Sequence, residues 1–189
     1  MKAHVRASIV TFFVLGISLA LYFGLRSQDD SVDKSIGAYQ SIEATGLPLF
    51  AFSDFTNATR NTEEFKKGTL IVTFWASWCA PCVEEFPSFV RLLEKRPQIR
   101  ILAISGDYKK EEIDKFLKTV MSFRDEKSKK AFYESFTITW DEKSEYRKIF
   151  GVMRLPEAFV FHNGQLERKI VGAIDWGNAE ALQFFDQLK

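Results

Sequence analysis

Residues 69–87 read TLIVTFWASWCAPCVEEFP, and this stretch decides the fold predicted for the chain. Residues 70–75 are β-branched, aromatic or leucine, and the run is too short for a buried helix, which favours a central β-strand. Cys79 and Cys82 follow after a short turn, with Pro81 between them. Proline suits the first turn of a helix, where its missing N–H costs nothing and its φ is already helical. The stretch therefore predicts a strand-to-helix junction with Cys79 at the start of the helix.

The predicted position of the cysteines has a chemical consequence. The unpaired N–H groups and the dipole of a helix start favour a thiolate there, so Cys79 is expected to be a nucleophile. Cys82, one turn further on, can attack the mixed disulfide that Cys79 forms and release the product. As a structural disulfide the pair would close too short a loop to stabilise much, and zinc would need four ligands. The pair predicts thiol–disulfide chemistry.

The motif resembles that of a known superfamily. Trp78 to Cys82, WCAPC, is similar to the active-site motif of the thioredoxin superfamily, and residues 74–87 resemble its membrane-anchored bacterial branch, the TlpA/ResA/CcmG-like proteins. The similarity extends, more weakly, from about Leu49 to the C-terminus. It implies an α/β, thioredoxin-like fold with a central mixed sheet flanked by helices.

The resemblance also implies a substrate-binding site. Pro156 matches the cis-proline of the superfamily, which packs beside the two cysteines, and the backbone of Leu155 would pair with an extended substrate. Trp78 is expected to lie partly exposed beside Cys79. Ala80 departs from the pattern, since ResA-like proteins often carry a glutamate there, and this puts a close match in redox potential or client in doubt.

Glu85 is the third candidate catalytic residue beside Cys79 and Cys82. It lies three residues after Cys82, so the two share a helix face, and it matches a functional glutamate of ResA-like proteins. A carboxyl group there could exchange a proton with Cys82 during resolution. The alternative is a surface carboxylate that only complements the helix dipole, as Glu84 is expected to do.

Composition excludes several other classes of function. The net charge is +1 with both signs mixed, which gives no sign of nucleic-acid binding. The chain has two histidines, His4 and His162, and two cysteines, so we expect no metal site and no cofactor. Met153 near Pro156 leaves a copper-binding module open, because soft sulfur ligands suit Cu(I).

The N-terminal residues predict a membrane anchor. Lys2 and Arg6 precede an apolar run over residues 7–25, which is just long enough to span a bilayer as a helix. A cleaved signal peptide is the alternative, with residues 18–20 as the cleavage site, but the apolar run continues past them. With the basic end inside, the remainder lies outside the cytoplasm. We therefore divide the chain into an anchor (1–26), a linker (27–46) and a thioredoxin-like domain (47–189), leaving open whether residues 36–45 link or pack.

After residue 47 the sequence predicts alternating strands and helices. This order is compatible with a mixed sheet, independently of the cysteine motif. Asn163-Gly164 is a strong hairpin signal between two of the predicted strands. The charged residues 122–134 are interpreted as a solvated helix extension. Strands are expected at 49–55, 70–75, 99–105, 136–140, 158–162 and 166–171, and helices at 63–67, 111–120, 144–150 and 176–188, besides the helix after Cys79.

The function predicted is that of a single-pass, membrane-anchored, extracytoplasmic oxidoreductase that reduces protein disulfides. By resemblance, its partners are disulfide-containing client proteins, with apocytochrome c as one candidate, and a membrane thiol-transfer protein as electron donor. A thiol peroxidase is the alternative enzyme. It is disfavoured because such enzymes place Pro and Thr or Ser where this chain has Val72 and Ala76.

Overall fold

The computed structural model describes residues 17–18, 20–21, 31–122 and 124–188. The predicted anchor, residues 1–26, lies almost wholly outside these residues. Within the part of the chain that is described, no helix is long and apolar enough to cross a bilayer.

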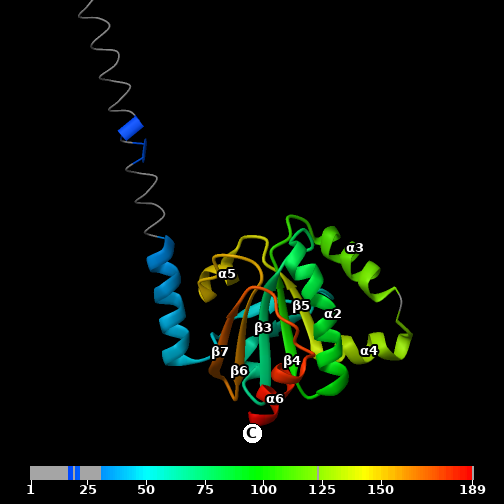
Figure 1. Cartoon of the computed structure of the whole chain (residues 1–189). Helices are drawn as coiled ribbons and strands as arrows, with labels where there is room; N and C mark the ends of the chain where they lie inside the picture. Colours follow the sequence, from blue (N-terminus) through cyan, green and yellow to red (C-terminus); the bar gives the residue numbers. More distant parts are fainter. Residues whose placement is uncertain (1–16, 19, 22–30, 123, 189) are drawn as a thin grey trace, which may run out of the picture.

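A five-stranded mixed sheet forms the centre of the molecule (Figure 1). β3 (Thr69–Trp75) is its middle strand, parallel to β4 (Arg100–Ser105) on one side and antiparallel to β6 (Glu157–His162) on the other. β5 (Phe136–Trp140) and β7 (Gln165–Val171) complete the order β5-β4-β3-β6-β7. Every residue of β3 is buried, which explains why the strand consists of apolar residues and two threonines.

Two hydrophobic cores lie on opposite faces of this sheet. On one face, alternate residues of β3 such as Ile71 and Trp75 pack under α2 (Ala80–Lys95), α3 (Lys110–Met121), α4 (Glu126–Ser135) and α6 (Ala179–Gln187). On the other face, Phe74 and its neighbours pack under α5 (Glu145–Phe150), η1 (Thr62–Phe65) and the small sheet of β1 (Ala51–Ser53) and β2 (Thr59–Asn61). The period-two alternation of the strands supplies both cores.

Residues 31–45 are helical and pack against the second core. Ile42 is buried there, and the Ser35 hydroxyl donates a hydrogen bond to the carbonyl of Gly151 at the end of α5. Of the two alternatives that the sequence leaves open for residues 36–45, the structure shows packing.

The charged segment 122–134 is not an extension of α3. α4 is a separate helix, begun by the Asp125 side chain, which accepts a hydrogen bond from the Ser128 N–H. Its Phe132 is buried against Phe86 and Phe136, so the segment carries an apolar anchor among its charges. The interpretation as a wholly solvated segment is therefore wrong.

The predicted hairpin is confirmed. Asn163 and Gly164 join β6 to β7 with φ of 49° and 80°, the left-handed conformation that Asn and Gly adopt most readily. The Asn163 side chain also accepts a hydrogen bond from the Gly68 N–H, which ties the hairpin to the start of β3.

Candidate active site

The two cysteines lie where β3 ends and α2 begins, and they form a disulfide with Cα atoms 5.3 Å apart. Cys79 is the N-cap of α2, and its Sγ accepts a hydrogen bond from the Cys82 N–H at 3.3 Å. Pro81 occupies the first turn, as predicted. A thiolate on Cys79 would keep this N–H donor and the positive end of the helix dipole.

The disulfide is nearly covered by its surroundings. Cys79 is 6% exposed and Cys82 2%, so Cys79 is the less buried residue of the pair. Trp78 precedes it and is 52% exposed. This ordering is the one expected for an attacking Cys79 and a resolving Cys82.

Asp107 fixes the loop that leads into Cys79, and the sequence analysis missed it. Its buried carboxylate accepts hydrogen bonds from the Ser77 N–H and hydroxyl and from the Ser105 hydroxyl, at 2.6–3.1 Å. The available signal is position: Asp107 follows β4, and carboxyl ends of neighbouring parallel strands meet at one sheet edge.

Tyr108 is a second residue that the sequence analysis missed. It is 78% exposed, and its ring stacks on that of Trp78 with centroids 5.9 Å apart and planes 21° apart. Together they form an open aromatic surface directly beside Cys79. Exposed aromatic rings of this kind are enriched where proteins contact partners.

Glu85 is buried on the inner face of α2, not at the surface. Its Oε1 accepts hydrogen bonds from the Trp176 indole N–H at 2.8 Å and from the Ile174 N–H at 3.1 Å. Burial raises the pKa of Glu85 to about 7, and the two donors oppose this only in part. The carboxyl group can therefore exchange a proton near neutral pH, which a surface glutamate could not do.

The peptide bond between Leu155 and Pro156 is cis, as the resemblance implies. The register of β6 against β3 places Glu157 opposite Phe74, so the bond lies at the end of β3 that carries the cysteines. The Pro156 carbonyl accepts from the Gly172 N–H. Within the described residues, the backbone N–H and C=O of Leu155 have no hydrogen-bond partner, as a client-pairing position requires.

Met153 is exposed at the end of the same loop. Among the described residues no group of three His, Cys, Asp or Glu side chains is close enough to hold a metal ion. His162 lies at the far end of β6, where its Nδ1 is 3.0 Å from the Thr69 hydroxyl.

Comparisons with known proteins agree with this geometry. The AhpC/TSA family model matches residues 44–169. The thiol–disulfide oxidoreductase ResA of Bacillus cereus is 26% identical over 170 residues, which cover 88% of this chain and 86% of ResA. The thiol:disulfide interchange protein HelX of Rhodobacter capsulatus is 28% identical over 156 residues, which cover 81% of this chain and 78% of HelX.

Solved structures of similar fold give the same picture. A putative thiol:disulfide interchange protein DsbE from Chlorobium tepidum superposes with a TM-score of 0.61 and 25% identity, covering 76% of this chain and 96% of that one. StoA from Bacillus subtilis, at 21% identity and a TM-score of 0.55, covers 76% and 99% and bears on the fold alone. The predicted thioredoxin-like fold with a mixed central sheet is thereby confirmed. The chain belongs to the AhpC/TSA family and carries a redox-active Cys79–Cys82 pair on a thioredoxin-like fold.

Proposed function

We propose that this thiol–disulfide oxidoreductase acts outside the cytoplasm as a reductase of protein disulfides, held at the membrane by residues 7–25. The observation that carries the proposal is the Cys79–Cys82 pair at the start of α2, beside an exposed aromatic surface and a cis-proline. The names of the relatives, which are oxidoreductases and interchange proteins, support the activity.

The reaction has two displacement steps. The Cys79 thiolate of the reduced pair attacks one sulfur of the client disulfide, forms a mixed disulfide and releases the other client sulfur as a thiolate, which takes up a proton. Cys82 then loses its proton and attacks the Cys79 sulfur, releasing the second client thiolate. Two electrons pass to the client, and the pair ends as the disulfide. A dithiol donor must reduce it again.

Glu85 is proposed to serve the second step. Its pKa of about 7 lets it accept a proton from Cys82 and return it to solvent between turnovers. The Trp176 and Ile174 N–H groups hold the carboxyl group in place from outside α2. Proton transfer at Glu85 would assist resolution more than attack.

The client is proposed to lie across Trp78, Tyr108 and Leu155. The free backbone groups of Leu155 would pair with an extended client segment, and the stacked rings would contact an apolar or aromatic client side chain. By resemblance to the ResA-like proteins, apocytochrome c is the candidate client, and a membrane thiol-transfer protein is the candidate donor. A test is thiol trapping of apocytochrome c in cells with and without the protein.

The direction of electron flow is tested by the reduction potential. Ala80 and Pro81 offer no positive charge between the cysteines, so the thiolate is not favoured as it is in strong oxidants. We expect a potential nearer to that of thioredoxin, about −270 mV, than to that of DsbA, about −120 mV. Equilibration of the full chain with glutathione buffers measures it. A value above about −160 mV would make the protein a disulfide donor.

The order of attack is tested by trapping. Cys82→Ser should accumulate mixed disulfides between Cys79 and client proteins, because the resolving thiol is missing. Cys79→Ser should accumulate none and serves as the matched control. Trapping through Cys82 alone would reverse the assigned roles.

A further inference from the structure

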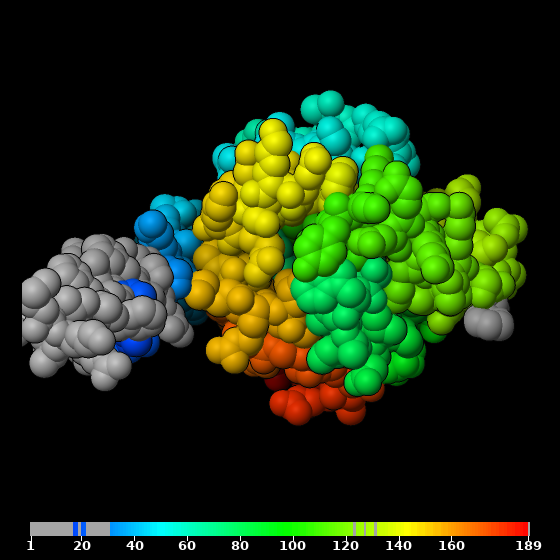
Figure 2. Space-filling view, turned by 90° about the horizontal axis from the view of Figure 1, so that it is seen from above, coloured from blue at the N-terminus to red at the C-terminus, as the bar shows by residue number. Residues whose placement is uncertain are grey.

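A pocket of about 470 Å³ lies between the helix of residues 31–45 and α5. In Figure 2, the blue helix is seated against the yellow and orange segment that contains α5. Three basic side chains line the pocket, Lys34 from the first helix and Arg147 and Lys148 from α5, and none of the described carboxylates lines it. Ser31, Ser35 and Ser144 also line the pocket, and the Ser35 hydroxyl is used by the Gly151 carbonyl.

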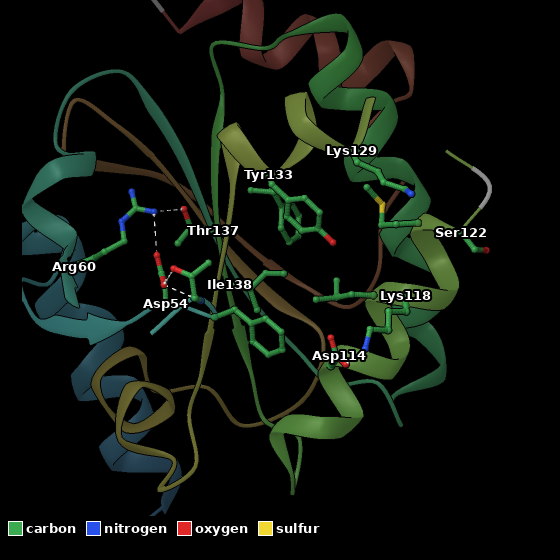
Figure 3. Close-up of a pocket in the computed structure, with 14 residues that line it drawn as sticks. Asp54, Arg60, Asp114, Lys118, Ser122, Lys129, Tyr133, Thr137 and Ile138 are labelled. Carbon is green, nitrogen blue, oxygen red and sulfur yellow. Dashed lines mark hydrogen bonds and ion pairs between the residues drawn. The ribbon is translucent and has the colours of Figure 1, made fainter. Parts of the chain in front are cut away.

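The three basic residues gathered in this pocket have no acidic partner there. A second pocket of about 480 Å³, on the side of β5, provides the comparison (Figure 3). There Arg60 pairs with Glu64, Lys118 with Asp114, and Lys129 with Glu126. By contrast, Lys34, Arg147 and Lys148 make no ion pair with any of the residues that the structure describes.

Arg147 is the clearest sign of a missing partner. Its Nε–H group is buried and donates no hydrogen bond to any group in the described part of the chain. The carboxylate of Asp141 accepts hydrogen bonds from the backbone N–H groups of Tyr146 and Arg147, so it is used by the start of α5. A buried donor without an acceptor is costly, and so are three like charges around one hollow.

The walls of the pocket are held by a close backbone contact. Gly151 ends α5 with φ of 63°, and a Cβ there would lie 2.6 Å from the Ser35 carbonyl oxygen. The Ser35 hydroxyl donates to the Gly151 carbonyl across the same contact. This backbone contact therefore fixes the position of the Lys34 backbone opposite α5.

We propose that this pocket binds a phosphate-type dianion, either free phosphate or the phosphate of a lipid headgroup. A phosphate group offers several strong acceptors to the guanidinium and the two ammonium groups, and charge-assisted hydrogen bonds of this kind are the strong ones. The bound anion would bridge the helix of residues 31–45 to α5. It would therefore stabilise the docked position of that helix.

The test is calorimetric titration of the full chain with inorganic phosphate at constant ionic strength, with chloride as the competing salt. Saturable binding is expected, with Lys34→Ala and Lys148→Ala each weakening it about tenfold, because each removes a charged donor. Lys118→Ala, in the comparison pocket, is the matched control and should leave the affinity unchanged.

A second arm identifies the source of the phosphate. Glycerol 3-phosphate, the soluble part of a lipid headgroup, is titrated beside inorganic phosphate. Tighter binding of glycerol 3-phosphate assigns the site to a headgroup, and equal or weaker binding assigns it to free phosphate. Amide shifts on phosphate addition should centre on residues 147–153. Absence of saturable binding, or equal affinity in wild type and in both lysine variants, would overturn the proposal.

Discussion

At the scale of single residues, Glu85 shows how far sequence reasoning reaches. Its spacing of three residues from Cys82 predicts that the two side chains share a helix face, and this prediction needs only the local sequence. Its donors come from Ile174 and Trp176, which lie 89 and 91 positions further along the chain. No local pattern predicts such contacts, so the burial and the raised pKa of the carboxyl group emerge only from the folded structure.

Glu85→Gln should change how stability depends on pH. Burial raises the pKa of Glu85 from 4.5 to about 7, so the folded state holds the proton more tightly than the unfolded state. The stability from this group is complete below pH 4.5 and is lost as pH rises to about 7. Glutamine cannot ionise, so the variant should gain up to about 3 kcal/mol relative to wild type between pH 4 and pH 8. Urea unfolding across this range measures it, and parallel curves would contradict it.

Glu85→Gln should also slow the resolving step. The mixed disulfide formed by Cys79 would then persist longer, because Cys82 loses its proton acceptor, while the first attack should be little changed. Stopped-flow measurement of both steps with a client peptide checks this. Glu84→Gln is the matched control, because Glu84 is exposed and makes no hydrogen bond with another described side chain.

At the scale of elements, the strand-to-helix junction is predictable and the loop beside it is not. The β3 and α2 boundaries follow from an apolar run, a proline and two cysteines within one short stretch. The support from Asp107 depends on β4 lying parallel to β3, which is a long-range pairing. The separate helix α4 was missed because its many charges mask the single apolar anchor, Phe132.

Asp107→Ala should loosen the active-site loop and lower stability. It would leave the N–H and hydroxyl of Ser77 and the hydroxyl of Ser105 without their acceptor, at a cost of about 2–4 kcal/mol. Client reduction should slow as well, because Trp78 would no longer be held beside Cys79. Denaturant unfolding and client kinetics measure the two effects. Asp114→Ala, which removes an exposed ion pair, should cost under about 1 kcal/mol.

At the scale of the whole molecule, the second core depends on a helix that sequence reasoning could not assign. Residues 31–45 combine exposed polar positions with few buried apolar ones, so their periodicity does not separate a linker from a packed helix. The contact that decides the matter joins Ser35 to Gly151, which are 116 positions apart. Here tertiary packing supplies what local propensity does not.

Ile42→Ala should release this helix from the rest of the domain. Ile42 is buried in the second core, and its truncation should cost about 3 kcal/mol. Limited proteolysis should then cut within residues 31–45 while the central sheet stays protected. Ile36→Ala, an exposed position of the same helix, should have neither effect. Equal cleavage of both variants would show that the helix is not held by Ile42.

The direction of the helix of residues 31–45 determines which end of the domain lies nearest to the preceding N-terminal residues. Its first described turn adjoins Gly151 and Met153, and the chain reaches the cis-proline at the disulfide end of β3 three residues after Met153 (Figure 1). The polypeptide therefore enters the domain at the end that carries the redox pair. If residues 7–25 span a bilayer, the five residues before the helix could hold it at most about 18 Å from the lipid. The disulfide would then face the membrane surface, within range of a membrane-embedded donor. Client proteins would have to approach the disulfide parallel to the membrane.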